Sequence, residues 1–121
     1  MKYQIRSLGY DPETDELDLL INADAPQPAE AISLENGIYI RRAFKNGAIV
    51  GAFIRGYEQF AREVSAKRVV SSERVKQQGL EEPFNAIVEW QREVGALSHQ
   101  LAEHLDAWPP QDSFLQILVQ S

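Results

Sequence analysis

The stretch from Asn36 to Tyr57 constrains this 121-residue chain more than any other. Two β-rich runs, 38–42 and 48–54, flank a Lys-Asn-Gly turn. Asn and Gly tolerate the positive φ angles that a tight hairpin turn requires. The second run is apolar at successive positions, which is typical of a central strand covered on both sides. A glycine within it, Gly51, indicates a bulge or the close approach of a neighbour. The pattern predicts a β-hairpin at the middle of a sheet.

The residues upstream of the hairpin predict further strands. Residues 2–10 form a first candidate strand, and the period-two pattern of Leu17, Leu19 and Ile21 predicts a second, antiparallel to the first. Asp and Pro between them favour a turn. The stretch 29–34 is either extended or a short turn. The hairpin therefore has at least two strands to pair with.

The chain changes to a helical period after residue 56. A helix is predicted over 57–70, and a longer helix from Pro83 to Ala107, since proline and glutamates suit a first turn. Apolar residues and one histidine recur at heptad spacing along this helix and just past its end: Ile87, Trp90, Val94, Leu97, Leu101, His104 and Trp108. Such a stripe either packs on the domain's own core or forms an interface between two copies of the chain.

The fold class follows from this order of elements. We expect an α+β domain: an antiparallel β-meander of about four strands plus a C-terminal strand, packed against two or three helices. Residues 1–121 form a single domain, with a β-meander over 1–56, a helical part over 57–107 and a strand over 113–120. The last strand is apolar on both faces, so it either joins its own sheet or pairs with a second subunit.

Composition excludes several classes of site. The chain has no cysteine and two histidines, which excludes disulfides, thiolate metal sites and a histidine-rich metal site. It lacks both a glycine-rich phosphate loop and a P-loop. The acidic turn at 11–18 is expected to be solvated. We therefore expect no catalytic residues, no metal and no cofactor, and not an enzyme. Without a secretory signal or a membrane-spanning run, the expected location is the cytoplasm, with no membrane partner.

Charge is distributed unevenly along the chain. Residues 1–40 and 77–121 each carry a net charge of −6, whereas residues 41–76 carry +6. Such asymmetry either marks a nucleic-acid site or means that the basic middle lies against the acidic ends. The candidate binding residues are Arg41, Arg42, Lys45, Arg55 and Tyr57. Arg41 and Arg55 can approach each other on adjacent strands, with tyrosines close by for cation–π contacts. Alternatively, these arginines pair with Asp18, Glu35 or the acidic long helix.

Several short motifs resemble the domain of unknown function 2283 family. They are Tyr10-Asp11-x-x-x-Asp15-x-Leu17, Gly37-Ile38-x-Ile40, Asn46-Gly47-x-Ile49-Val50-Gly51 and Ile54. The resemblance covers about residues 8–60 and leaves the helical tail outside it. It implies a small bacterial protein built as a β-meander, and an antitoxin-like or regulatory role. The chain departs from the family at Lys45 or Asn46 and at Phe53, where the family places acidic residues.

The function expected from these features is that of a small interaction or regulatory protein that associates with itself, most simply as a homodimer, or with another protein. The heptad stripe and the doubly apolar C-terminal strand favour it. The alternative is a nucleic-acid-binding protein that uses the basic segment 41–76.

Overall fold

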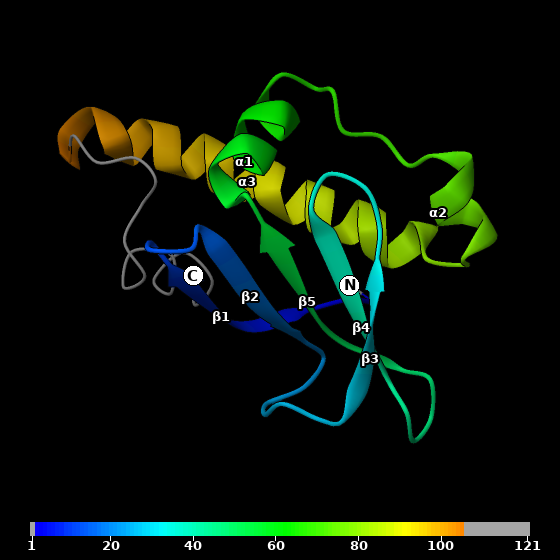
Figure 1. The fold of residues 1–121 in the computed structure, drawn as a ribbon. Helices are drawn as coiled ribbons and strands as arrows, with labels where there is room; N and C mark the ends of the chain where they lie inside the picture. Colours follow the sequence, from blue (N-terminus) through cyan, green and yellow to red (C-terminus); the bar gives the residue numbers. More distant parts are fainter. Residues whose placement is uncertain (1, 106–121) are drawn as a thin grey trace.

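A computed structural model describes residues 2–105, with side chains described through residue 95. It confirms the α+β class: a five-stranded antiparallel sheet carries helices on one side (Figure 1). The strands are β1 (Ile5–Asp11), β2 (Glu16–Ile21), β3 (Ala29–Ser33), β4 (Ile38–Ala43) and β5 (Ile49–Arg55). The helices are α1 (Tyr57–Ser65), α2 (Glu73–Gln77) and α3 (Glu81–Leu105).

The strand order is β1-β2-β5-β4-β3, so β5 is the central strand and the predicted hairpin does occupy the middle of the sheet. The meander comprises β3, β4 and β5. The β1–β2 hairpin is antiparallel, as predicted, and lies on the other side of β5. The stretch that the pattern left open is a strand, β3, at the edge. Because β2 pairs with β5, the connection 22–28 has to cross from one half of the sheet to the other.

Three of the four Asn and Gly residues in the predicted turns have positive φ angles, and Asn46 is the exception. Asn36 and Gly37 have φ angles of 59° and 77°, and Gly47 has 70°. The Asn46 side-chain oxygen accepts a hydrogen bond from the Ala48 amide at 3.0 Å. A Cβ atom at position 37 would lie 2.2 Å from the Arg55 carbonyl oxygen. Glycine at 37 therefore serves two needs, the positive φ and the close approach of β5.

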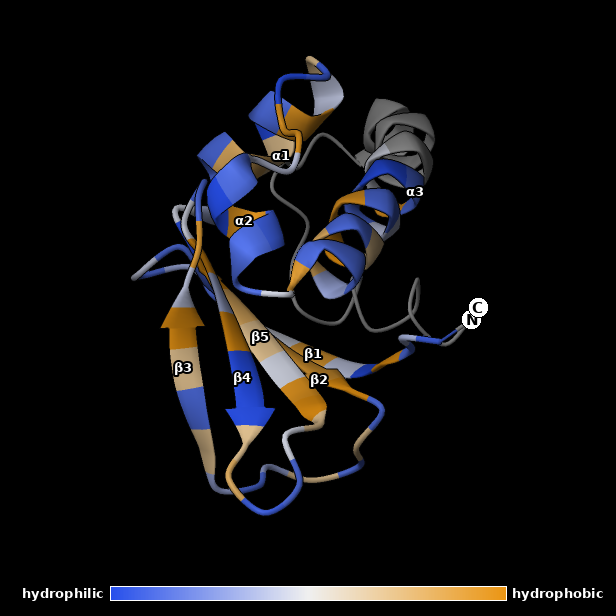
Figure 2. Cartoon of the chain, turned by 90° about the vertical axis from the view of Figure 1, so that its right-hand side faces the viewer, coloured by the Kyte–Doolittle hydropathy of each residue, from blue (hydrophilic) through white to orange (hydrophobic). Residues whose placement is uncertain are grey.

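The main core lies between the sheet and the helices. Period-two alternation directs Leu17, Leu19, Ile38, Ile40 and Ile54 to the helix-covered face, and all are at most 1% exposed. The helices contribute apolar faces to the same cluster, chiefly Tyr57, Phe60, Val64, Phe84, Ile87 and Val94. Figure 2 shows the helices stacked over one face of the sheet. Each fully buried large side chain stabilises the fold by about 1.5–3 kcal/mol.

The helix boundaries differ from the predicted ones at two places. The helix predicted over 57–70 ends at Ser65, because Lys67 turns the chain with a φ of 59°. A short helix follows, and its N-cap Ser72 accepts a hydrogen bond from the Val75 amide. The long helix begins at Glu81, with Pro83 in its first turn. None of the described helices has both the length and the apolar character needed to cross a bilayer.

The structure contradicts the use of Ile87 and Val94 as interface residues. Their side chains are 0% and 4% exposed and belong to the chain's own core, against which Trp90 also packs. At these three described positions the heptad spacing reflects intrachain packing. Leu97, Leu101 and His104 fall in the part of α3 without described side chains, and Trp108 and the strand predicted over 113–120 fall outside the described residues.

Candidate functional site

The face of the sheet turned away from the helices is the candidate site, and we call it the open face. Strand register places its side chains in three rows across β2, β5 and β4. The rows are Glu16–Arg55, Asp18–Phe53–Tyr39 and Leu20–Gly51–Arg41. Among the described residues no helix covers these rows. The open face thus combines charged and aromatic side chains at the centre of the sheet.

Four side chains on the open face form an arginine–aromatic cluster: Tyr39, Arg41, Phe53 and Arg55. The Tyr39 and Phe53 rings stack with centroids 4.5 Å apart and planes 5° apart. The Arg41 guanidinium carbon lies 4.8 Å from the Phe53 ring centroid. The Arg55 guanidinium carbon lies 5.1 Å from the centroid of Tyr39 and 5.6 Å from that of Phe53. Both arginines are therefore held by cation–π contacts.

Each arginine of the cluster also pairs with a carboxylate of β2. An Arg41 Nη atom donates to Asp18 at 2.9 Å, and Arg55 Nε lies 3.5 Å from Glu16. The Arg41 side chain is 35% exposed and that of Arg55 64%, so these pairs contribute at most about 1 kcal/mol each to stability. Their charges remain available to an incoming partner.

Gly51 allows the β2 backbone to approach β5 closely, and the Arg41 side chain lies over this glycine. A Cβ atom there would lie 2.8 Å from the Leu19 carbonyl oxygen and 3.6 Å from Arg41 Cδ. The predicted bulge is next to it, where the β4–β5 register shifts between Arg41 and Arg42. The extra residue is Val50 of β5, whereas Arg41 and Arg42 point to opposite faces by ordinary strand alternation and pair with Asp18 and Glu30.

A hollow of about 490 Å³ lies beside the cluster. Its lining includes Ser7, Gly9, Asp18, Leu20, Pro26, Gln27, Arg41 and Val50. The residues from β1 and β2 and those from the connection 22–28 enclose it from two directions. This hollow is the concave part of an otherwise exposed sheet surface.

The structure brings together only part of the predicted basic site. Arg41 and Arg55 share Phe53, as their adjacent strands suggested. Arg42 instead pairs with Glu30, at 2.7 Å. Lys45 is exposed in the β4–β5 turn, with no ion pair to any described residue. Tyr57 is wrongly assigned to the site, because it is 0% exposed on the helix-covered face.

Tyr57 belongs to the core instead. Its hydroxyl donates to Gln91 Oε1 at 2.8 Å, which satisfies the side-chain oxygen of a glutamine that is 1% exposed. Its ring meets that of Tyr10 edge-on at 5.6 Å. Burial raises the pKa of Tyr57 to about 12.

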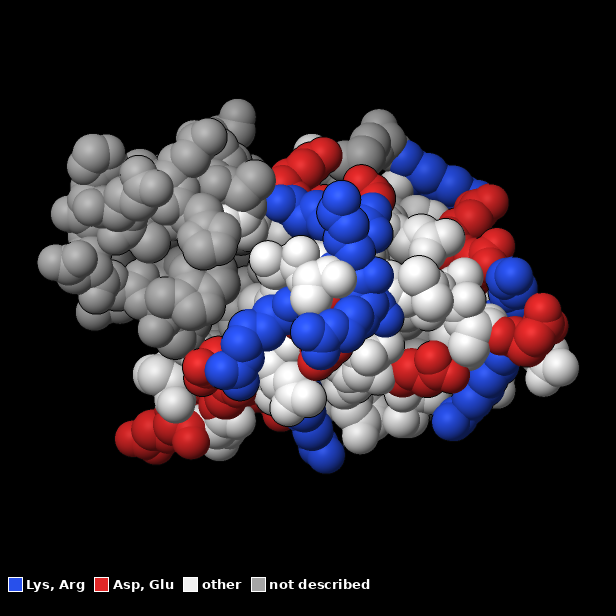
Figure 3. Space-filling view, turned by 90° about the horizontal axis from the view of Figure 1, so that it is seen from above, with Lys and Arg blue, Asp and Glu red and all other residues white. Residues whose placement is uncertain are grey.

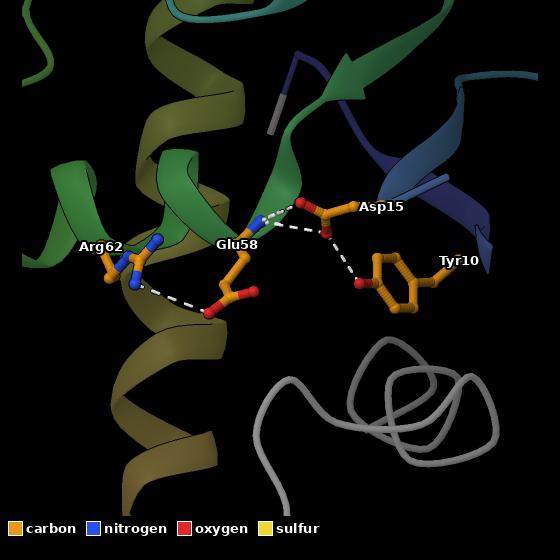
Figure 4. Close-up of polar contacts among 4 residues, drawn as sticks. All are labelled: Tyr10, Asp15, Glu58 and Arg62. Carbon is orange, nitrogen blue, oxygen red and sulfur yellow. Dashed lines mark hydrogen bonds and ion pairs between the residues drawn. The ribbon is translucent and has the colours of Figure 1, made fainter. Parts of the chain in front are cut away.

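The acidic turn 11–18 does not gather its carboxylates around one point, and no cluster of metal-ligating side chains occurs among the described residues. Asp15 instead caps α1 from a distance (Figure 4). Its carboxylate accepts hydrogen bonds from the Glu58 amide at 3.2 Å and from the Tyr10 hydroxyl at 2.7 Å. Its carbonyl oxygen accepts from the amides of Gly56 and Tyr57. Burial, together with the bond to Asp15, raises the pKa of Tyr10.

Intrachain pairing accounts for much of the basic segment 41–76. Seen from above, basic atoms gather in a band with acidic atoms beside them (Figure 3). The pairs outside the open face are Arg42–Glu30, Arg62–Glu58, Arg68–Glu63 and Lys76–Glu81. Of the acidic partners considered, Asp18 pairs with an arginine, whereas Glu35 accepts a hydrogen bond from Ser72.

Sequence reasoning missed the role of Phe53. Once β4 and β5 are paired through the 45–47 turn, Phe53 lies opposite Tyr39. The alternation of side chains in the two strands would therefore have predicted this aromatic pair.

No protein-family model, curated protein or solved structure matches this chain. The open face therefore has to be interpreted from its own geometry.

Proposed function

We propose that the protein is a self-associating interaction module, in which the open face packs against the open face of a second copy. The observation that carries the proposal is the division of charge across this face. Its carboxylates, Asp11, Glu16 and Asp18, lie on the β1–β2 side. Its arginines, Arg41 and Arg55, extend from β4 and β5.

A two-fold axis parallel to the strands makes such a face complementary to itself. Rotation about that axis exchanges the two sides of the sheet, so the carboxylate side of one copy meets the arginine side of the other. An isologous interface of this kind uses the same patch on both copies, so the patch has to be complementary to itself after the two-fold rotation. Two antiparallel sheets can pack in this way, face to face, about 10 Å apart.

The composition of the patch supports the same proposal. Tyrosine, phenylalanine and arginine are enriched at protein interfaces, and Tyr39, Phe53 and the two arginines form the centre of the open face. The cation–π contacts fix the arginines in advance, so less side-chain entropy is lost on association.

Sedimentation equilibrium with charge-reversed variants tests the proposal. Arg41→Glu/Arg55→Glu makes the face acidic throughout, and Glu16→Arg/Asp18→Arg makes it basic throughout. We expect the wild type to be a dimer, each variant alone to be a monomer, and an equimolar mixture of the two to form a heterodimer. Arg42→Glu/Arg62→Glu is the matched control, because it changes the net charge equally outside the open face and should leave the dimer intact.

Two outcomes would overturn the proposal. One is a wild-type monomer at high micromolar concentration. The other is a dimer that neither charge-reversed variant weakens, which would assign self-association to another segment, such as 113–120. Circular dichroism of each variant distinguishes loss of association from loss of folding.

A second candidate function is the binding of single-stranded nucleic acid. Stacked aromatic rings flanked by arginines on an open sheet are the kind of surface on which bases stack. Against it, Asp18 and Glu16 lie beside both arginines, and the chain carries a net charge of −6. A salt-dependent shift of DNA or RNA that is lost in Arg41→Glu/Arg55→Glu would favour this candidate.

The resemblance to the domain of unknown function 2283 family fits a regulatory use of such a module. An antitoxin-like role is one regulatory use that this proposal includes. A pull-down from the native host, using the wild type and Arg41→Glu/Arg55→Glu, tests whether a further protein binds through the same face.

A further inference from the structure

We propose that the hollow on the open face binds a small aliphatic α-amino acid, and that this ligand regulates self-association through the same residues. The volume of about 490 Å³ falls in the range of ligand sites, roughly 300–1,000 Å³. Gly9 forms an unobstructed part of the wall, since a Cβ atom there would meet nothing within 4 Å.

The two charged residues of the hollow define the ligand's charge. Arg41 and Asp18 bring one positive and one negative group to its wall, 2.9 Å apart. An anion would compete with Asp18 for the guanidinium, and a cation would compete with Arg41 for the carboxylate. A zwitterion satisfies both groups and keeps the site neutral. In an α-amino acid the ammonium and carboxylate are attached to the same carbon. They can therefore reach Asp18 and Arg41 together, because these two side chains are themselves in contact.

Arg41 is preorganised for this role. It uses one N–H group for Asp18, its guanidinium lies over Phe53, and its stem crosses Gly51. A guanidinium has five N–H groups, so others remain to bind a carboxylate with charge-assisted hydrogen bonds. Because the arginine is already held in place, little conformational entropy is lost when the ligand binds.

The remaining walls favour an aliphatic side chain. Leu20, Val50 and Pro26 contribute apolar surface, while Ser7 and Gln27 contribute neutral polar groups at the rim. A branched aliphatic group can bury its surface against the first three residues. L-Leucine is therefore the probe of choice.

The regulatory part of the inference rests on the proposed function. A bound amino acid would occupy the charges of Arg41 and Asp18 that the second copy needs. By linkage, a ligand that competes with association must bind the monomer more tightly than the dimer. We expect L-leucine to shift the protein towards the monomer.

Amide chemical-shift mapping tests the site at a protein concentration below the association range. L-Leucine up to about 10 mM should shift the amides of β1, β2 and the connection 22–28 in the wild type. The probes 4-methylpentanoate and 3-methylbutylamine each lack one of its charges and should bind at least about tenfold more weakly. Equal binding of either analogue would overturn the zwitterion assignment.

Two variants and a control locate the binding. Gly9→Val fills the hollow from an edge strand, and Arg41→Gln removes the guanidinium, so both should abolish the shifts. Arg42→Gln removes the neighbouring arginine, which pairs with Glu30, and should leave them unchanged. Shifts that persist in Gly9→Val, or none in the wild type, would overturn the site.

Sedimentation with and without L-leucine then tests the regulation separately. Leucine-dependent dissociation of the wild-type dimer supports it, and an unchanged dimer with a bound ligand overturns the coupling alone. If the wild type binds leucine but is a monomer at every concentration, the proposed function fails while the ligand site stands.

Discussion

The two faces of the sheet surround consecutive residues of β5 with different kinds of side chain. Ile54 faces the helices, is fully buried and has only apolar neighbours to satisfy. Phe53, one residue earlier, faces away and is covered by two guanidinium groups and a tyrosine ring. The first arrangement stabilises the fold. The second arrangement also buries Phe53, which is 9% exposed, but it leaves the charges around the ring at the surface, so this face is where binding is to be sought.

The largest expected effect tests the helix-covered face. Ile54→Ala removes a fully buried side chain, and we expect the free energy of unfolding to fall by about 2–5 kcal/mol. Tyr39→Ser on the open face should lower it by no more than about 1.5 kcal/mol. Urea denaturation of both variants gives the difference. Equal losses would mean that the open face is as much a part of the core as the covered one.

The next effect concerns the long-range cap of α1. Asp15→Ala removes the carboxylate that accepts from the Glu58 amide, and it places alanine at a φ of 54°. We expect a loss of about 2 kcal/mol in the free energy of unfolding, measured by thermal and urea denaturation. Asp15→Asn tolerates the same φ and should lose about half as much. A smaller loss for alanine than for asparagine would contradict the capping role.

A smaller, pH-dependent effect comes from Tyr57. Burial raises its pKa from the ordinary 10 to about 12, so its contribution to stability is complete below pH 10 and is lost between pH 10 and pH 12. Tyr57→Phe leaves Gln91 without its hydrogen bond and should cost about 1–2 kcal/mol at pH 7. Because phenylalanine does not titrate, the difference from the wild type should shrink as the pH rises above 10. A constant difference across that range, in urea denaturation curves, would argue against the burial of a neutral tyrosine.

The smallest expected effect on stability belongs to the open face. Arg41→Gln removes a half-exposed ion pair, and the free energy of unfolding should change by less than about 1 kcal/mol. The same variant should weaken self-association clearly in sedimentation experiments. A large loss of stability without a change in association would contradict the proposal that the helix-covered face provides stability and the open face provides association.

The sequence predicts the fold better than it predicts the site. Alternation and turn chemistry locate β1, β2, β4 and β5, because each is a local pattern. The edge strand β3 is ambiguous, since its small side chains carry little hydrophobic signal and its partner β4 decides its conformation. The end of α1 at Ser65 depends on the left-handed conformation of Lys67, for which a lysine gives no signal.

The candidate site depends on pairing between distant residues, which a local pattern does not contain. Arg41 and Asp18 are predicted as possible partners from charge alone, and the structure shows that they pair. The sequence wrongly assigns Tyr57 to the site because it is close to Arg55 along the chain. The chain turns at Gly56, so that Tyr57 lies on the helix-covered face instead. The heptad stripe on α3 cannot distinguish an intrachain neighbour from a second copy, since both need the same spacing.

The central position of β5 has a consequence for how the protein is made. During synthesis, the β1–β2 and β3–β4 pairs can each form from neighbouring residues. The two pairs become one sheet only when β5 inserts between β2 and β4. Until residue 55 has left the ribosome, β2 and β4 each present an unpaired edge, and the apolar face stays uncovered until the helices have followed. Pairings of this sequence separation are slow to form. The interval before β5 inserts is therefore the time at which the edges of β2 and β4 are open to pairing with another chain, and a fast-closing 45–47 turn shortens it.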